Sequence, residues 1–323
     1  MKIMLASMTV KPEVIIGLKA IGGDAITVAD TEAAAIAALD GANAAIVSDN
    51  AYTAGLANAL AASPTLQFLQ IMTAGYDNAT RLGLPRRATI ASVGAAFSPS
   101  VALHAVALML ALQRGIAQMA TSKTTRHWDK ALAGTLTMAL GKTCTILGYG
   151  SIGREIARMV APLGMKVIGL NRTGVPHPLA AEVHRIDALH AILPRTDVLI
   201  IAAPHNPSTD KIIGATELAL MKPTALLVNI SRGKLVDTPA LNEALRAGRI
   251  AGAALDVTEP EPLPQDHPLW DAPNLIVSPH VAGAAGNFGA ERQLEFVGAN
   301  LRRYLAGEPV QNIVISPSPP HTS

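Results

Sequence analysis

Residues 143–171 read TCTILGYGSIGREIARMVAPLGMKVIGLN, and this stretch decides the fold. Each end of it is an apolar run that predicts a buried strand, and apolar residues recur at helical spacing between the two runs. The turn from the first strand into the helix is a G-x-G-x-x-G pattern. Such a pattern within a βαβ unit of about 30 residues is typical of dinucleotide-binding loops. We therefore expect a cofactor loop made of Gly148, Tyr149, Gly150, Ser151, Ile152 and Gly153.

The alternation of strand and helix continues beyond this unit. Further apolar runs, separated by helical segments, predict strands at 198–202, 225–230, 250–255 and 275–277. Buried parallel strands read as continuous apolar runs, because helices cover both faces of the sheet. The pattern predicts a doubly wound parallel sheet of the Rossmann type.

The N-terminal part of the chain predicts a second sheet of the same class. Apolar runs at 3–5, 45–47 and 68–71 predict strands, and residues 12–21 and 30–39 predict helices. A length of 323 residues fits two domains at roughly 150 residues each. The fold class expected is therefore α/β, with two doubly wound parallel-sheet domains.

Several connecting segments have distinct expectations. Residues 101–114 predict a long apolar helix, and the polar segment 121–135 predicts an arm or loop. The proline-rich stretch 259–268 predicts an ordered loop, and residues 291–305 predict a last helix. The polar tail, 316–323, is expected to be disordered.

Composition excludes several classes of function. With 26 Lys+Arg against 24 Asp+Glu, the formal charge is +2, and no basic run indicates nucleic-acid binding. The single cysteine, Cys144, excludes an intramolecular disulfide and multi-cysteine metal sites, and no histidine pair has metal-ligand spacing. The apolar run at 101–112 is shorter than the about 20 residues of a membrane span. We expect a cytoplasmic protein without a metal.

The end of the second strand of the βαβ unit indicates which dinucleotide binds. An NAD site usually has a carboxylate there, which accepts a hydrogen bond from the ribose 2′-hydroxyl. This chain has Asn171, Arg172 and Thr173 instead. A guanidinium pairs with a 2′-phosphate, whereas a carboxylate would repel it. NADP(H) is expected in preference to NAD(H), and the alternative is a solvated Arg172 with NAD held by other contacts.

Three polar residues each follow or end an apolar strand: Arg232, Asp256 and His280. Ligands of open α/β sheets bind beyond the carboxyl ends of the strands, so we expect all three to face the cofactor crevice. Glu261, in the proline-rich loop, is near enough in sequence to reach the same place.

This set suits hydride transfer to a 2-oxo acid. A guanidinium binds the substrate carboxylate and polarises the carbonyl, and a histidine with an ordinary pKa near 6.5 donates the proton at neutral pH. Glu261 would orient that histidine. Position alone leaves His205 as a rival of His280, because His205 also follows a strand and a proline, and Glu259 and Asp266 as rivals of Glu261.

From about residue 74 to 312 the chain resembles the D-isomer-specific 2-hydroxyacid dehydrogenases. The matching segments are LGYGSIGREIA (147–157), NISRGKLVDTPALNEAL (229–245), GRIAGAALDVTEPEPLPQDHPL (248–269), NLIVSPHVAG (274–283) and GEPVQNIV (307–314). Their order and spacing both fit the family.

The resemblance implies a domain division and a set of site residues. The family has a flavodoxin-like substrate domain, here 1–98 plus 289–323, and a Rossmann cofactor domain, here 99–288. It assigns catalysis to Arg232, Glu261 and His280, and thereby favours His280 over His205, whose segment resembles a loop near the cofactor. The other positions that it implies are Ala203, Pro204, Ile230 and Asp256 at the cofactor, Asp256 holding the nicotinamide carboxamide, and Ala74, Gly75 and Tyr76 at the substrate carboxylate.

The function expected is the D-specific reduction of a small 2-oxo acid with NADPH in preference to NADH, similar to that of the glyoxylate/hydroxypyruvate reductases. The protein is expected to be a homodimer. Two departures from the family pattern concern the substrate: Leu103 stands where Glu is usual, and the segment after His280 lacks the usual Thr. Alternatives are a dehydrogenase of bulkier acids or of phosphite, and a non-catalytic dinucleotide-binding sensor.

Overall fold

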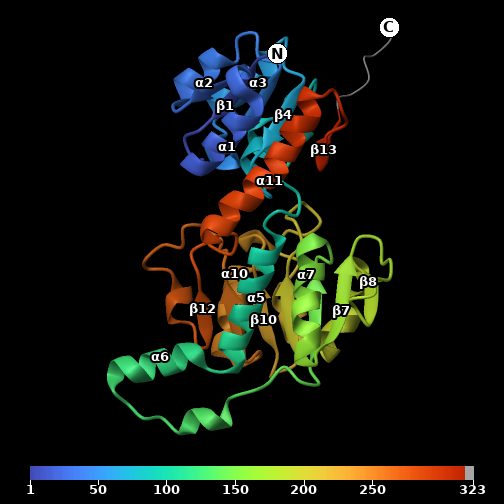
Figure 1. Ribbon diagram of the computed structural model, residues 1–323. Helices are drawn as coiled ribbons and strands as arrows, with labels where there is room; N and C mark the ends of the chain where they lie inside the picture. The colour runs from blue at the N-terminus through green and yellow to red at the C-terminus, as the bar shows by residue number, and fades with distance from the viewer. Residues whose placement is uncertain (317–323) are drawn as a thin grey trace. The chain divides into compact units, whose positions relative to one another are not determined.

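The computed structural model describes residues 1–316 (Figure 1). The chain divides into two compact units, one formed by Met1–Phe97 with Ala285–Ser323 and the other by Ser98–Ala284. The sequence places these boundaries after residues 98 and 288, one and four residues further along. The tail expected to be disordered lies outside the described residues, except for Ser316.

The first unit is built on a six-stranded sheet in the order β13-β5-β4-β3-β1-β2. All neighbours are parallel except β13, which runs antiparallel to β5 at the edge of the sheet. Its strands are β1 (Ile3–Ala6), β2 (Ile26–Ala29), β3 (Ala44–Val47), β4 (Phe68–Ile71), β5 (Thr89–Ala91) and β13 (Ile313–Ile315).

Helices cover both faces of this sheet. Alternate residues along β1 enter opposite cores, because side chains of a strand alternate between faces: Met4 packs in one cluster, and Ile3 and Leu5 pack in the other. Its helices are α1 (Pro12–Gly22), α2 (Glu32–Ala38), α3 (Ala54–Ala62), α4 (Asp77–Leu82) and α11 (Gly286–Leu305).

The second unit is a seven-stranded, wholly parallel sheet in the order β12-β11-β10-β9-β6-β7-β8. The order reverses between β6 and β9, which is the point where ligands bind in open α/β sheets. Its strands are β6 (Thr143–Leu147), β7 (Lys166–Asn171), β8 (Glu182–Arg185), β9 (Val198–Ile201), β10 (Leu226–Asn229), β11 (Gly252–Leu255) and β12 (Leu275–Val277).

The helices of the second unit also form two layers. Helices α5 and α7 pack side by side on one face, where Ala105, Met109 and Ile156 join one core (Figure 1). Leu189, Leu218 and Leu241, from the other layer, join the second core. The helices of this unit are α5 (Ser98–Gln113), α6 (Ile116–Thr125), α7 (Ser151–Val160), α8 (Leu189–Ile192), α9 (Ala215–Leu220) and α10 (Thr238–Arg246).

The polar segment 121–135 is not entirely the loop that its composition predicts. Its first five residues belong to α6, and only the remainder forms the connection to β6, with a short 3-10 turn at Ala131–Gly134. The hydroxyls of Thr121, Thr124 and Thr125 donate to the carbonyls four residues earlier. These bonds accommodate the threonine side chains on a helix that buries no residue, although they do not themselves stabilise it.

Other elements also differ from the expectation. The last helix begins at Gly286, five residues before the predicted start. Strands β2, β5, β8 and β13 were not predicted; β2, β8 and β13 lie at sheet edges and are less completely buried than the strands between them. Both parallel-sheet α/β units are nevertheless confirmed, and so is the proline-rich loop.

Within residues 1–316, no single helix is long and apolar enough to cross a membrane. Helices α5 and α6 reach the required length and hydropathy only when taken together, and the chain bends by 61° between them.

Candidate active site

The glycine loop after β6 has the geometry of a phosphate-binding turn. Gly148 has a φ of +102°, and a Cβ there would lie 2.2 Å from the backbone nitrogen of Ala203. A Cβ on Gly153 would lie 2.4 Å from the carbonyl oxygen of Gly148, so both positions require glycine. At Gly150 a Cβ would have no neighbour within 4 Å. The space beside Gly150 is therefore open to a ligand.

Helix α7 begins at this open position. Its N-cap, Gly150, offers no side chain to the first amides of the helix, so these amides are available to an anion. Ser151 is exposed and Ile152 is half-buried at this end. The loop and the helix start fit the pyrophosphate of a dinucleotide, as the sequence predicts.

Tyr149 contributes to the loop through its backbone. Its side chain is 2% exposed and packs against Gly169 of β7, where a Cβ would lie 2.5 Å from the ring. Burial raises the pKa of its hydroxyl. Within the described chain that hydroxyl has no hydrogen-bond partner.

The turn after β7 is shaped by Asn171. Its Oδ1 accepts hydrogen bonds from the amides of Thr173 (2.9 Å) and Gly174 (2.7 Å) and from the Thr173 hydroxyl (3.2 Å). Arg172 is exposed on this turn, and Arg185, paired with Asn171 across the strands, packs against Gly174. Asn171 Oδ1 and the Thr173 hydroxyl therefore help to fix the turn that carries Arg172.

Arg232 follows β10 in an extended conformation fixed by its neighbours. Asn229 Nδ2 donates to the Arg232 carbonyl (2.9 Å), and Arg232 Nη1 donates to the Ser231 carbonyl (2.6 Å). A Cβ on Gly233 would lie 2.0 Å from the carbonyl oxygen of Thr258. The turn carrying Arg232 is thus packed directly on the chain that leads to Glu261.

His280 and Glu261 form a close pair. Nδ1 of His280 lies 2.6 Å from Oε1 of Glu261, and the two side chains are 48% and 40% exposed. The other carboxylate oxygen of Glu261 accepts from the Thr258 amide at 3.5 Å. Thr258 therefore joins the Arg232 turn to the Glu261–His280 pair, at the carboxyl ends of β10, β11 and β12.

His205, the rival of His280, has a carboxylate partner of its own. Its Nε2 lies 2.8 Å from Oδ1 of Asp210, in the loop after β9. Ala203 is buried in this loop, Pro204 is exposed, and the Pro204 carbonyl accepts from the Thr209 hydroxyl. Ile230, at the end of β10, is buried.

Asp256 does not face an open crevice as expected. Its side chain is 1% exposed, and its Oδ1 accepts from the Ser278 hydroxyl (2.6 Å) and the Val281 amide (2.9 Å). Its Oδ2 accepts from the Ala282 amide (2.9 Å). The carboxylate therefore holds the turn that carries His280, and its role at the nicotinamide carboxamide stays a prediction.

In the first unit, residues 74–76 follow β4 and precede α4. Asp49 is buried and accepts from the amides of Asn78 (3.1 Å) and Ala79 (2.9 Å), which fixes the start of α4. Among residues 1–316, the amides of Ala74, Gly75 and Tyr76 have no hydrogen-bond acceptor. They are thus free to bind an anion.

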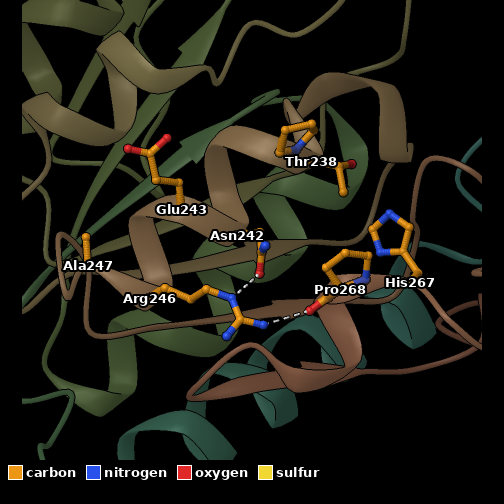
Figure 2. A pocket seen from close by; sticks show the side chains of 8 residues that line it. Thr238, Asn242, Glu243, Arg246, Ala247, His267 and Pro268 are labelled. Atoms are coloured by element: carbon orange, nitrogen blue, oxygen red, sulfur yellow. Dashed lines mark hydrogen bonds between the residues drawn. The ribbon is translucent and has the colours of Figure 1, made fainter.

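A groove of the second unit lies apart from these residues. A groove of about 640 Å³ runs along α10 and is lined by Thr238, Pro239, Asn242, Glu243, Arg246, Ala247, His267 and Pro268. Figure 2 shows Arg246 donating to the Asn242 side chain and to the Pro268 carbonyl, at 3.2 Å in both cases. None of the predicted site residues lines it.

Residues 106–282 match the family model of the D-isomer specific 2-hydroxyacid dehydrogenase, NAD binding domain. The chain belongs to this family. It is 36% identical over 258 residues to a glyoxylate reductase of Thermococcus gammatolerans, covering 76% of this chain and 75% of the relative. A glycerate dehydrogenase of Methylorubrum extorquens is 35% identical over 272 residues, covering 80% and 82%.

Solved structures agree with this assignment. A D-isomer specific 2-hydroxyacid dehydrogenase family protein from Aeromonas salmonicida has a TM-score of 0.83 at 27% identity, covering 97% of this chain and 98% of that chain. An acyclic imino acid reductase in complex with NADPH and D-Arg has a TM-score of 0.82 at 26% identity, covering 98% and 100%. This chain is therefore a 2-hydroxyacid dehydrogenase of two parallel-sheet domains.

Sequence analysis did not find the residues that support the dehydrogenase site. Asn229, Ser278 and Asp49 act through hydrogen bonds to turns, and none stands in a pattern of its own. His104 gave a signal, since it is the one imidazole in the otherwise apolar run 101–112. Its partner, Ser278, lies 174 residues away, and no spacing rule connects the two.

Proposed function

We propose that this dehydrogenase reduces a small 2-oxo acid to the D-2-hydroxy acid with NADPH. The observation that carries the proposal is the His280–Glu261 pair, joined through Thr258 to the Arg232 turn, at the same edge of the parallel sheet as the glycine loop. A cation, an imidazole and its carboxylate partner at one end of the sheet are the set that this reduction requires.

Each residue has a defined task in this proposal. The Arg232 guanidinium binds the substrate carboxylate and polarises the carbonyl oxygen. A bound NADPH supplies the hydride to the carbonyl carbon. His280 transfers a proton to the carbonyl oxygen, which completes the hydroxyl group, and is then left neutral. Glu261 accepts from Nδ1 and so keeps Nε2 directed at the substrate.

Substitution of the two histidines tests this assignment. His280→Asn should lower kcat by about 10²–10⁴-fold, because general acid catalysis contributes that much. His205→Asn is the matched control, since His205 also pairs with a carboxylate, and it should retain turnover. The assay is NADPH oxidation with glyoxylate and hydroxypyruvate. The opposite ranking of the two variants would overturn the assignment.

The cofactor preference belongs to the same proposal. Arg172 is held exposed on the Asn171 turn, with the Arg185 side chain beside that turn and no carboxylate at the end of β7. Arg172→Ala should lower the ratio of kcat/KM with NADPH to kcat/KM with NADH by about tenfold, as expected for loss of a charged hydrogen bond. Arg249→Ala, at the amino end of β11, is the control. A wild type that prefers NADH would refute the preference.

The free amides of residues 74–76 support a further contact with the substrate carboxylate. Backbone amides suit the substrate carboxylate, because this anionic group is the same in every 2-oxo acid. Substrates that keep the carboxylate and change the other substituent should therefore vary in kcat/KM, whereas the corresponding aldehydes without a carboxylate should not be reduced. Equal rates for both groups would contradict this role.

A second candidate substrate class is the 2-imino acids. It is favoured by the match to an acyclic imino acid reductase over nearly the whole chain. The same proton donor and the same carboxylate site would serve it. Adding an amine to the 2-oxo acid assay distinguishes the two: imino acid reduction requires both components and yields a secondary amine.

We also propose that the protein is a cytoplasmic homodimer. The second unit carries exposed large apolar side chains on α5, α6 and the segment that leads to β6, and a partner would bury them. Trp128, in that segment, is 88% exposed. Also exposed there are Leu103, Ile116, Met119, Met138 and Leu140. Light scattering of the wild type and of Trp128→Ser tests this proposal. The wild type should have the mass of a dimer, and a monomeric wild type would refute the proposal.

A further inference from the structure

The turn that carries His280 is held in an unusual backbone conformation. His280 has a φ of +53°, in the left-handed region that side chains other than glycine rarely adopt. Its amide donates to the backbone carbonyls of Asp256 (2.8 Å) and Ser278 (3.0 Å). Such a conformation persists only where surrounding contacts hold it.

Helix α5 holds this turn from one face. Ser100 Oγ lies 3.0 Å from the carbonyl oxygens of both Ala282 and Ala284. His104 Nε2 lies 3.0 Å from the Ser278 hydroxyl and 3.3 Å from Oδ1 of Asp256. Since residues four apart lie on the same face of a helix, Ser100 and His104 contact the segment on both sides of His280.

The protons of this network can be assigned. Ser278 donates its single hydroxyl proton to Asp256, so its oxygen can only accept from His104. His104 therefore carries a proton on Nε2, which it offers to the Ser278 oxygen and to the nearby Asp256 oxygen. The buried carboxylate thus receives its donors from His104, from Ser278 and from the amides after His280.

We propose that His104, through Ser278 and Asp256, is a positioning residue for His280. It touches neither substrate nor the reacting atoms in this arrangement. Its Nε2–H fixes the orientation of the Ser278 hydroxyl, which fixes the Asp256 carboxylate, which in turn holds the left-handed turn of His280. The inference rests on the proposed function, in which His280 is the proton donor.

Two variants of the full chain distinguish the loss of the His104 hydrogen-bond donor from a change in side-chain volume. His104→Leu fills the same space without a donor, whereas His104→Gln keeps an N–H near the position of Nε2. His104→Leu should lower kcat with glyoxylate about tenfold, because a displacement of about 1 Å at a catalytic group can cost up to about 100-fold. His104→Gln should recover most of the kcat.

A second readout needs no turnover. Amide hydrogen exchange of Val281 and Ala282 should speed up about tenfold in His104→Leu and return toward wild type in His104→Gln. Ser278→Ala should give the same exchange pattern as His104→Leu, and it serves where His104→Leu fails to fold. Wild-type exchange and kcat in His104→Leu would overturn the inference, as would a loss that His104→Gln does not restore.

The failure of this inference is distinguishable from that of the proposed function. If His280→Asn keeps wild-type turnover, the proposed proton donor is wrong, and the exchange measurement still decides whether His104 holds the turn. If His280→Asn is inactive while both His104 variants behave as wild type, only the positioning role is refuted.

Discussion

Gly150 offers a substitution that separates cofactor binding from folding. A Cβ at this position has no protein neighbour within 4 Å, and its φ of −95° lies outside the left-handed region that favours glycine. Gly150→Ala should therefore keep the stability of the unliganded protein within about 1 kcal/mol of wild type, because the added methyl group meets no protein atom.

The effect on dinucleotide affinity follows from two distances. A methyl carbon keeps other atoms about 3.5–4.0 Å away, whereas an amide bonded to a phosphate oxygen lies about 2.7–2.9 Å from it. The methyl group thus moves the pyrophosphate outward by about 1 Å and breaks at least one charged hydrogen bond. Loss of one such bond costs about 1.5–3 kcal/mol, which is a rise in Kd of about 10- to 100-fold.

The assay is titration of NADPH fluorescence at fixed salt, with the melting temperature measured on the same samples. Gly134→Ala is the matched control, because a Cβ there also has no neighbour within 4 Å but lies in the arm before β6. Gly148→Ala, whose Cβ would collide with the Ala203 backbone, should lose stability as well as affinity. An unchanged Kd in Gly150→Ala would refute the assignment of the loop as the pyrophosphate site.

Three further predictions concern stability and reactivity. Ion pairs with Arg195, Lys166 and His184 lower the pKa of Glu182 to about 2. The contribution of Glu182 to the free energy of unfolding is therefore complete above its ordinary pKa of 4.5 and disappears as the pH falls through about 2. Because exposed ion pairs are weak, Glu182→Gln should lower the free energy of unfolding in urea by about 1 kcal/mol at pH 7, and by less at pH 3. Asp49→Ala removes the acceptor of two α4 amides, so it should cost about 1 kcal/mol and raise KM for the 2-oxo acid. Burial raises the pKa of the Cys144 thiol to about 12, so iodoacetamide at pH 8 should modify it only after unfolding, as intact mass would show.

The cofactor half of the site could be predicted from sequence because its signal is local. The glycines at 148, 150 and 153 sit between a strand and a helix, and each has the environment that the motif requires. The positions of Arg232 and His280 at one edge of the sheet were predictable, because buried parallel strands are continuous apolar runs and the residues after such strands lie at that edge. The choice of His280 over His205 needed the family resemblance, since both imidazoles have a carboxylate partner.

The rest depends on contacts that are distant in sequence. Asp256 ends a strand as predicted. However, Ser278, Val281 and Ala282, which donate hydrogen bonds to its buried carboxylate, lie in a turn more than 20 residues later. Strand β13 is three residues long and exists only because β5 offers an edge. Helix α6 extends into a polar sequence whose threonines bond back to the helix. None of these is visible in a single stretch of residues.

The first unit is assembled from segments on both sides of the second unit, so its parts are synthesised at different times. Ala290, Val297 and Leu301 of α11 pack against Ile3 and Leu5 of β1, and β13 closes the edge beside β5. A ribosome makes these two elements after every strand of the second unit. A nascent chain that ends at residue 284 thus contains every strand of the second unit, whereas its first unit still lacks one wall of its core.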